Sequence, residues 1–428
     1  MKMHGKYLRV MAAVGITTTS LSMLPASAVA SGGSGAVHAT LLITAGDPSQ
    51  QVLQTLMAEY AKIHPGSTLT VTQIVQSSVD QKLTLDASAG DLPTIFIGPQ
   101  SPTQQGQFGT EGYSLNIQTA LTSLGVYNDL NPAAVKILKT LEGGLYAIPD
   151  QLAMEGFWYN KKIFAQNNIT PPTTWSAMVS DAAALEAKGI QPFAADGSDG
   201  WPLTRLISGY IFRDLGPNAL LKVKDGTAKL TDPQYVAAAQ QVADLGAKGY
   251  FGKGFATLDY SAAEAEFLDG EAAMFYMGSW ALPDFANPKL SEIGASDVGY
   301  FPVPAVAGGA GAVTDTPMNC GEPLMFSAKA YNAADAQWLK FVAENFGNAA
   351  LKQGDITGFE VLPKVTTATP LMQIVQHQIA VTTTPVLWFE AYFSSKATTV
   401  AQSDAAPLVD GGMSAQQYMS NVQAALDS

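Results

Sequence analysis

The sequence predicts an α/β fold built as two lobes, and three observations predict it. Strand-like and helix-like segments alternate over residues 39–97, as in a parallel sheet flanked by helices. Later, a helix-like segment leads into a glycine-bounded apolar run at 272–277, which is typical of a strand covered on both faces. The chain has 428 residues, 47% of them hydrophobic, which is enough for two separate cores.

The first lobe is predicted from the alternating elements near the N-terminus. They are a strand over 39–44, a helix after Pro48 that ends at His64-Pro65-Gly66, a strand around 69–71, a helix over 78–89 and a strand over 94–97. The loops after the first and third strands leave the carboxyl edge of the sheet, where α/β proteins bind ligands. We therefore interpret Asp47 and Gln100 as ligand hydrogen-bonding groups, although Asp47 is an equally good N-cap for the following helix.

The stretch from Phe267 to Phe285 combines a helix end, a buried strand and a turn. We expect the helix to end at Gly270, because glycine most easily takes the left-handed conformation that follows a helix. Gly278 ends the strand, and Ser279 is expected to cap a second helix. Trp280 would then lie at a strand-to-helix turn beside free backbone amides, which predicts a ligand-contacting aromatic residue.

Two motifs resemble the family 1 extracellular solute-binding proteins, which are the ligand-capturing subunits of ABC importers. One is GEAAMFYMGSW at 270–280, and the other is a long segment beginning YAIPDQLAMEGFWYN at 146–160. With the N-terminal leader and the last helix, the resemblance covers essentially the whole mature chain. It implies a two-lobe, type II-like periplasmic binding protein fold with a mostly parallel sheet in each lobe and three inter-lobe crossings. It also implies ligand capture by hinge closure.

The chain divides into expected segments at these crossings. They are a signal peptide at 1–30, a flexible linker at 31–36, a first lobe at 37–149 and 321–357, and a second lobe at 150–320 and 358–428. The leader has a basic start, an apolar stretch and small residues at its end, so we expect cleavage and a periplasmic or extracellular protein. It contains no cysteine for a lipid anchor. Cys320 is the only cysteine, so no internal disulfide forms, and we expect it to be a small buried hydrophobe.

Polar candidates for the site follow from the crossings that the resemblance implies. Asp150 and Gln151 come just after the first crossing and would face the cleft, and Glu322 lies at the second. Carboxylates and amides there would bind the hydroxyl groups of a sugar.

Aromatic candidates are the tryptophans that are not assigned to a core. Trp175 and Trp338 read as core residues, which leaves Trp158, Trp201 and Trp388 beside Trp280. Helix packing is an equally good interpretation of Trp201, and the strand position of Trp158 could point it into the sheet. Trp388 lies about where related proteins place a late aromatic residue.

Composition and charge exclude several other classes. The net charge of −13 argues against nucleic acid or an anionic membrane as the main partner. Charged residues are only 14% of the chain against about 25% usually, which suits an acidic milieu as a hypothesis. His38, His64 and His377 are too scattered for a metal site, and no cofactor is expected.

The predicted function is capture of a carbohydrate similar to a malto-oligosaccharide and its delivery to ABC transporter permease subunits by a monomer. Two alternatives stay open. A polyamine would suit the negative charge and the aromatics. A secreted glycosidase needs paired carboxylates, but Glu264 and Glu266 point to different sides of one helix and Glu271 follows its end.

Overall fold

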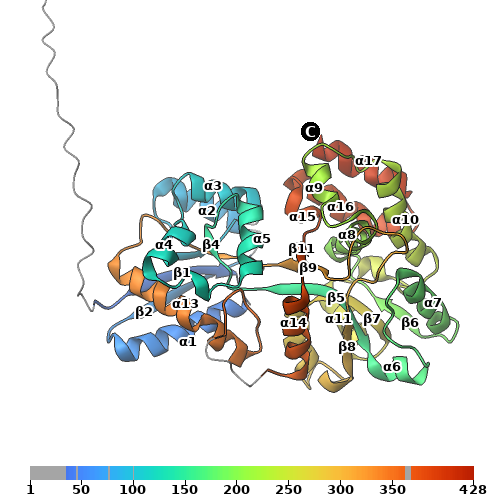
Figure 1. Ribbon diagram of the computed structural model, residues 1–428, viewed down its shortest axis with the longest axis horizontal. Helices are drawn as coiled ribbons and strands as arrows, with labels where there is room; N and C mark the ends of the chain where they lie inside the picture. Colours follow the sequence, from blue (N-terminus) through green and yellow to red (C-terminus); the bar gives the residue numbers. More distant parts are fainter. Residues whose placement is uncertain (1–34, 45–46, 76–77, 100, 362–367) are drawn as a thin grey trace, which may run out of the picture. The chain divides into compact units, whose positions relative to one another are not determined.

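The computed structural model describes residues 35–44, 47–75, 78–99, 101–361 and 368–428. The expected signal peptide, residues 31–34 of the linker and Gln100 lie outside this range. The described chain forms two sheets with helices around each, and Figure 1 gives the labels used here. The α/β two-lobe fold class is thereby confirmed, and we define each lobe by its sheet.

The sheet of lobe 1 has five strands in the order β2-β1-β3-β10-β4. The strands are β1 (His38–Thr44), β2 (Thr68–Ile74), β3 (Ile95–Ile97), β4 (Ala147–Ile148) and β10 (Leu324–Phe326). The helices in these parts of the chain are α1 (Pro48–Ile63), α2 (Val79–Ala89), α3 (Pro102–Thr110), α4 (Ile117–Leu124), α5 (Pro132–Glu142) and α13 (Ala333–Gln353), with the 3-10 turn η2 (Tyr127–Asp129). Helices α1 and α13 pack against each other.

The sheet of lobe 2 has six strands in the order β11-β9-β5-β7-β6, with β8 also paired to β5. The strands are β5 (Ala153–Asn160), β6 (Gln191–Ala194), β7 (Ala272–Gly278), β8 (Val298–Phe301), β9 (Asp315–Asn319) and β11 (Thr384–Val386). The helices are α6 (Lys161–Gln166), α7 (Trp175–Glu186), α8 (Trp201–Leu215), α9 (Ala219–Lys224), α10 (Pro233–Ala247), α11 (Tyr260–Leu268), α12 (Leu282–Ala286), α14 (Pro370–Val381), α15 (Phe389–Tyr392), α16 (Ser395–Val409) and α17 (Ala415–Leu426). Three 3-10 turns complete it: η3 (Phe255–Thr257), η4 (Ser279–Ala281) and η5 (Ala295–Asp297).

The strand directions are more mixed than the expected mostly parallel sheets. Strands β1, β2 and β3 are parallel, as the alternation of elements predicts. Strand β10 is antiparallel to β3 and β4, and β5 is antiparallel to β7, β8 and β9. The antiparallel strands β4, β5, β9 and β10 flank passages of the chain from one sheet to the other. Because such a strand is not joined to its neighbours through a crossover helix, it need not run parallel to them.

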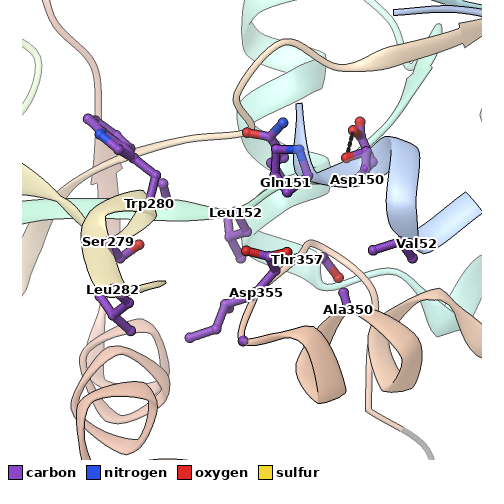
Figure 2. A pocket seen from close by; sticks show the side chains of 15 residues that line it. Val52, Asp150, Gln151, Leu152, Ser279, Trp280, Leu282, Ala350, Asp355 and Thr357 are labelled. Atoms are coloured by element: carbon purple, nitrogen blue, oxygen red, sulfur yellow. Dashed lines mark hydrogen bonds between the residues drawn. The ribbon is translucent and has the colours of Figure 1, made fainter. Parts of the chain in front are cut away.

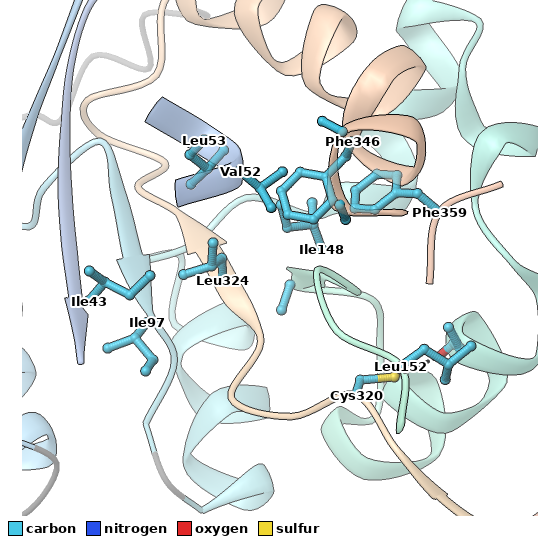
Figure 3. Close-up of a cluster of buried hydrophobic side chains, with 14 of the residues drawn as sticks. Ile43, Val52, Leu53, Ile97, Ile148, Leu152, Cys320, Leu324, Phe346 and Phe359 are labelled. Carbon is cyan, nitrogen blue, oxygen red and sulfur yellow. Dashed lines mark hydrogen bonds between the residues drawn. The ribbon is translucent and has the colours of Figure 1, made fainter. Parts of the chain in front are cut away.

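The chain passes between the two sheets three times: from β4 to β5, from β9 to β10, and between α13 and α14. The first and third passages are bonded to each other, since the Gly358 N–H donates to the Pro149 carbonyl (2.8 Å) and the Leu152 N–H to the Ile356 carbonyl (3.1 Å). Apolar side chains of these segments are buried, including Leu152, Cys320 and Phe359 (Figure 3). The expectation that Cys320 is a small buried hydrophobe is confirmed.

Local expectations around β7 are mostly confirmed. Gly270 follows α11 with φ +78°, and the strand ends at Gly278. Ser279 does not cap a helix, so that prediction is wrong. Its hydroxyl instead accepts a hydrogen bond from the Met154 N–H (3.2 Å) and joins β5 to the turn, because a 3-10 turn and not an α-helix follows directly.

Candidate functional site

Two cavities are lined by residues from both lobes, and they share Gln151, Trp201 and Trp280. The first, here the Arg205 cavity, has a volume of about 670 Å³, and the second, the Asp355 cavity, about 650 Å³. The Arg205 cavity is also lined by Ser101, Gln105, Arg205, Asn319, Glu322 and Glu390. The Asp355 cavity is also lined by Pro48, Gln51, Tyr260, Asp284, Gln353 and Asp355. Each volume lies within the range of small-molecule sites.

An aromatic wall made of Trp201, Trp280 and Tyr260 borders the Asp355 cavity. The ring centroids of Trp201 and Trp280 are 5.9 Å apart with planes tilted by 57°, and Trp201 stacks on Tyr260 at 6.4 Å. The turn after β7 requires Gly278, because a Cβ there would lie 2.0 Å from the Trp280 ring. The fold therefore brings together two indoles that are 79 residues apart in the sequence, positions 201 and 280.

A partly buried ion pair in lobe 2 supports this wall. The Arg205 guanidinium binds the Glu155 carboxylate and lies 4.5 Å from the ring centroids of both Trp201 and Trp388. Glu155 also accepts hydrogen bonds from the Tyr276 hydroxyl (3.0 Å) and the Trp388 Nε1–H (2.8 Å). Burial raises the pKa of Glu155, and the Arg205 charge and these hydrogen bonds oppose that rise. The cation is thus held by a partner and by two aromatic faces.

On the lobe 1 side, α1 begins at Asp47, whose carboxylate accepts the Ser49 N–H at 2.8 Å. The Gln151 Nε2–H donates to the same carboxylate at 3.3 Å, so the first crossing is tied to the start of α1. Asp150 is fully buried nearby. Its carboxylate accepts hydrogen bonds from the Ser49 hydroxyl (2.6 Å) and the Leu324 N–H (2.9 Å). Burial raises the pKa of Asp150, and the nearby Asp47 charge raises it further.

A pocket of about 40 Å³ lies among the first crossing, the turn after β7 and the end of α13 (Figure 2). It shares Pro48, Gln151, Trp280 and Asp355 with the Asp355 cavity. In Figure 2, Trp280 comes from the turn after β7, whereas Asp355 comes from the segment after α13. Side chains from both lobes are therefore close together at this point.

The structure brings together four of the residues predicted from the sequence: Gln151, Trp201 and Trp280 line both cavities, and Glu322 lines the Arg205 cavity. Asp47 caps α1 and accepts a hydrogen bond from Gln151 but lines neither cavity, so its interpretation as a ligand-binding group stays a prediction. Gln100 lies outside the described residues.

Three other predicted residues line neither cavity. Asp150 and Trp158 have an exposed fraction of 0% and Trp388 of 3%. Their polar atoms bond inside the protein; the Trp158 Nε1–H, for example, donates to the Met277 carbonyl at 3.0 Å. Asp150 borders only the 40 Å³ pocket, so the expectation that it faces the cleft stays a prediction, and all three residues are left out of the proposed site. Trp175 and Trp338 are buried, as expected.

Sequence reasoning missed several cavity residues, and one of them had a readable signal. Arg205 lies four residues after Trp201 on α8, and this spacing places the guanidinium next to the indole on one helix face. Gln51 lies one turn into α1, and Gln353 and Asp355 lie at the end of α13, where no motif marks them.

The described residues contain no group of three or more His, Cys, Asp or Glu side chains placed to hold a metal ion. Among these same residues, no helix combines the length and the apolar character needed to cross a membrane.

Comparisons with known proteins agree with this architecture. The model of the bacterial extracellular solute-binding protein family matches residues 43–348. An uncharacterised ABC transporter extracellular-binding protein of Pyrococcus horikoshii is 30% identical over 171 residues, which are 39% of this chain and 38% of that protein. The multiple sugar-binding protein of Streptococcus mutans is 26% identical over 286 residues, 64% of each chain. These matches thus span less than two thirds of either relative.

A solved structure is similar over nearly its whole length. It is that of a chitin oligosaccharide binding protein, with a TM-score of 0.77 and 26% identity, covering 92% of this chain and 98% of the other. The family match covers well over half of the sequence, and the two-sheet fold fits it. This chain belongs to the bacterial extracellular solute-binding protein family.

Proposed function

We propose that this protein captures a carbohydrate between its two lobes and delivers it to the membrane subunits of an ABC transporter. One observation carries the proposal: two indoles border a pair of cavities whose other walls carry amide and carboxylate side chains from both lobes. A sugar ring offers a C–H face for stacking and hydroxyl groups for hydrogen bonds, so it needs this combination of partners.

The printed names of related proteins support the same ligand class. The relative in Streptococcus mutans is a multiple sugar-binding protein, and the similar solved structure is that of a chitin oligosaccharide binding protein. The proposed contacts are Trp201, Trp280, Gln151 and Glu322, with Asp47 orienting Gln151. A malto-oligosaccharide stays the first ligand to test.

Hinge closure is the proposed mechanism. The lobes comprise residues 37–149 with 321–357 and residues 150–320 with 358–428, and the three passages between the sheets form the hinge. A ligand that contacts both lobes binds the closed form best and shifts the population toward it. We expect a dissociation constant in roughly the micromolar range, which corresponds to a free energy of binding of about −8 kcal/mol. The transporter would recognise the closed form.

In this proposal the mature protein is a monomer that is released outside the cytoplasmic membrane after cleavage of residues 1–30. It returns its ligand chemically unchanged. Glu264, which could be imagined as a catalytic acid, accepts a hydrogen bond from the Tyr260 hydroxyl at 3.0 Å, and this contact supports a structural role.

A thermal-shift screen over a carbohydrate panel tests the proposal. We expect at least one sugar to raise the melting temperature of the parent protein, with little or no effect on Trp280→Ala. Trp175→Phe is the matched control, because Trp175 is buried against Tyr210 and contacts neither cavity. A panel without any stabilising sugar, or product formation from a bound sugar, would refute the proposal.

A further inference from the structure

The Asp355 cavity combines an aromatic wall with carboxylates and lacks any basic side chain among the described residues that line it. Asp284 comes from α12 in lobe 2, and Asp355 from the segment after α13. Neither carboxylate makes a hydrogen bond or an ion pair with the rest of the described chain, and both are only partly exposed. The amides of Gln51, Gln151 and Gln353 complete the polar lining.

The Arg205 cation, which lies against the aromatic wall, is already engaged on the side of the other cavity. Arg205 lines only the Arg205 cavity, where it binds Glu155 and lies 4.5 Å from the centroid of Trp201 and 5.8 Å from that of Trp280. It therefore does not neutralise the carboxylates of the Asp355 cavity through an ion pair.

The local electrostatics agree with an excess of negative charge here. Burial, with a smaller contribution from the nearby Asp47 charge, raises the pKa of Asp355 to about 6. Burial raises the pKa of Glu264 to about 7, with a further contribution from Asp284. Negative groups that lack a positive neighbour hold their protons more tightly, and a bound cation would relieve this effect.

We infer that the Asp355 cavity takes a sugar unit that carries a protonated amino group, stacked on the indole wall with its ammonium near Asp284 and Asp355. The inference rests on the proposed function, and it specifies the class of sugar. An ammonium forms charge-assisted hydrogen bonds with carboxylates and is also attracted to indole faces. A uronic acid would meet two like charges, and a neutral sugar would use the carboxylates only as hydrogen-bond acceptors.

Matched ligands test the inference on the unaltered protein. Titration calorimetry at about pH 6.5 compares trisaccharides of glucosamine and of N-acetylglucosamine, which differ in the charge and acetylation of the nitrogen. We expect the glucosamine trisaccharide to bind about tenfold more tightly, and the galacturonic acid trisaccharide to bind more weakly than either. Equal affinity for the first two, or tighter binding of the acetylated one, would overturn the inference but leave carbohydrate capture intact.

Variants locate the effect in the cavity. In Asp284→Asn/Asp355→Asn, the preference for glucosamine should fall from about tenfold to about twofold or less, while affinity for the neutral sugar changes little. Asp181→Asn is the matched control, because Asp181 is a partly exposed helix carboxylate that lines neither cavity. A preference retained in the double variant would overturn the inference.

Binding of spermidine distinguishes an amino-sugar site from a polyamine site. We expect spermidine to bind at least about tenfold more weakly than the glucosamine trisaccharide, because it has no ring to stack on the wall. Tight spermidine binding with no binding of any sugar would overturn both the inference and the proposed function.

Discussion

The Arg205 cavity and the Asp355 cavity share two indoles but differ in how their charges are balanced. In the Arg205 cavity the guanidinium is bound to Glu155 and packed between Trp201 and Trp388. In the Asp355 cavity the carboxylates of Asp284 and Asp355 have no bonded partner among the described residues. The Arg205 cavity is thus lined by a cation that is paired before a ligand arrives, although one buried Glu390 oxygen there has no hydrogen-bond partner, whereas no cation lines the Asp355 cavity among the described residues. The same two indoles therefore border two different chemical environments.

The largest expected effect comes from removing the cation of the Arg205 cavity. Arg205→Met leaves the fully buried Glu155 carboxylate without its cation, and should lower the free energy of unfolding by about 3–5 kcal/mol. Urea denaturation followed by circular dichroism measures it. Lys82→Met is the control, because Lys82 forms an exposed helical pair with Asp86 and should cost less than about 0.5 kcal/mol. Similar losses in the two variants would mean that the Arg205 pair is not a supporting element.

A smaller effect, on ligand binding, is expected from removing the Trp280 indole that both cavities share. Trp280→Ala should weaken ligand binding by about 2 kcal/mol, roughly 30-fold, because the residue lines both cavities. Calorimetry with the best ligand from the carbohydrate screen measures it. If Trp280→Ala binds as tightly as Trp175→Phe, the indole wall is not where the ligand stacks.

The Asp355 cavity should have its own pH signature. The pKa of Asp355 is raised to about 6, so the folded state holds its proton more tightly than the unfolded chain does. The contribution of the Asp355 carboxyl to the free energy of unfolding is fully present below about pH 4. It is lost as the pH rises toward about 6, because the folded state then has to release the proton. Asp355→Asn should therefore gain stability relative to the parent, on the order of 1–2 kcal/mol, between about pH 4 and pH 6.

Urea denaturation of the two proteins across this pH range gives the difference directly. Other buried carboxyls, such as Glu142 with a pKa raised to about 8, affect both proteins equally and cancel. A stability difference that stays constant over this range would contradict the assigned environment of Asp355.

The smallest effect is expected at an exposed amide of the lobe 1 wall. Gln51→Ala removes one neutral hydrogen-bonding group from the Asp355 cavity, and should weaken binding about threefold, or less than about 1 kcal/mol. Gln416→Ala, on the exposed face of α17, is the control and should bind as the parent does. A loss comparable to that of Trp280→Ala would mean that lobe 1, and not the aromatic wall, dominates recognition.

Much of the fold could be predicted because its signals are local. Glycine after α11 and the apolar run of β7 mark boundaries that depend on nearby residues alone. The strand directions in lobe 2 could not be predicted this way, because β5 pairs with β7, β8 and β9 from distant parts of the chain. Hydrogen-bond partners of that kind leave no pattern within a short window.

The site shows the same division. The position of Trp280 at the cavities could be predicted because motif and local geometry coincide in the turn after β7. Trp158 and Trp388 were placed in the site because tryptophans are good sugar platforms, but burial decides whether an indole faces a cavity, and burial depends on the whole fold. Asp355 was missed because nothing in its own segment distinguishes it from other acidic residues after a helix.

The single thiol offers a practical consequence. Cys320 is 2% exposed and lies in the passage from β9 to β10, and burial raises its pKa, so it should react slowly with alkylating dyes. A second cysteine introduced on the rim of either cavity would then be labelled almost alone. An environment-sensitive fluorophore at that point would convert the natural receptor into a reagentless optical biosensor for its own ligand, without any need to remove the native sulfur.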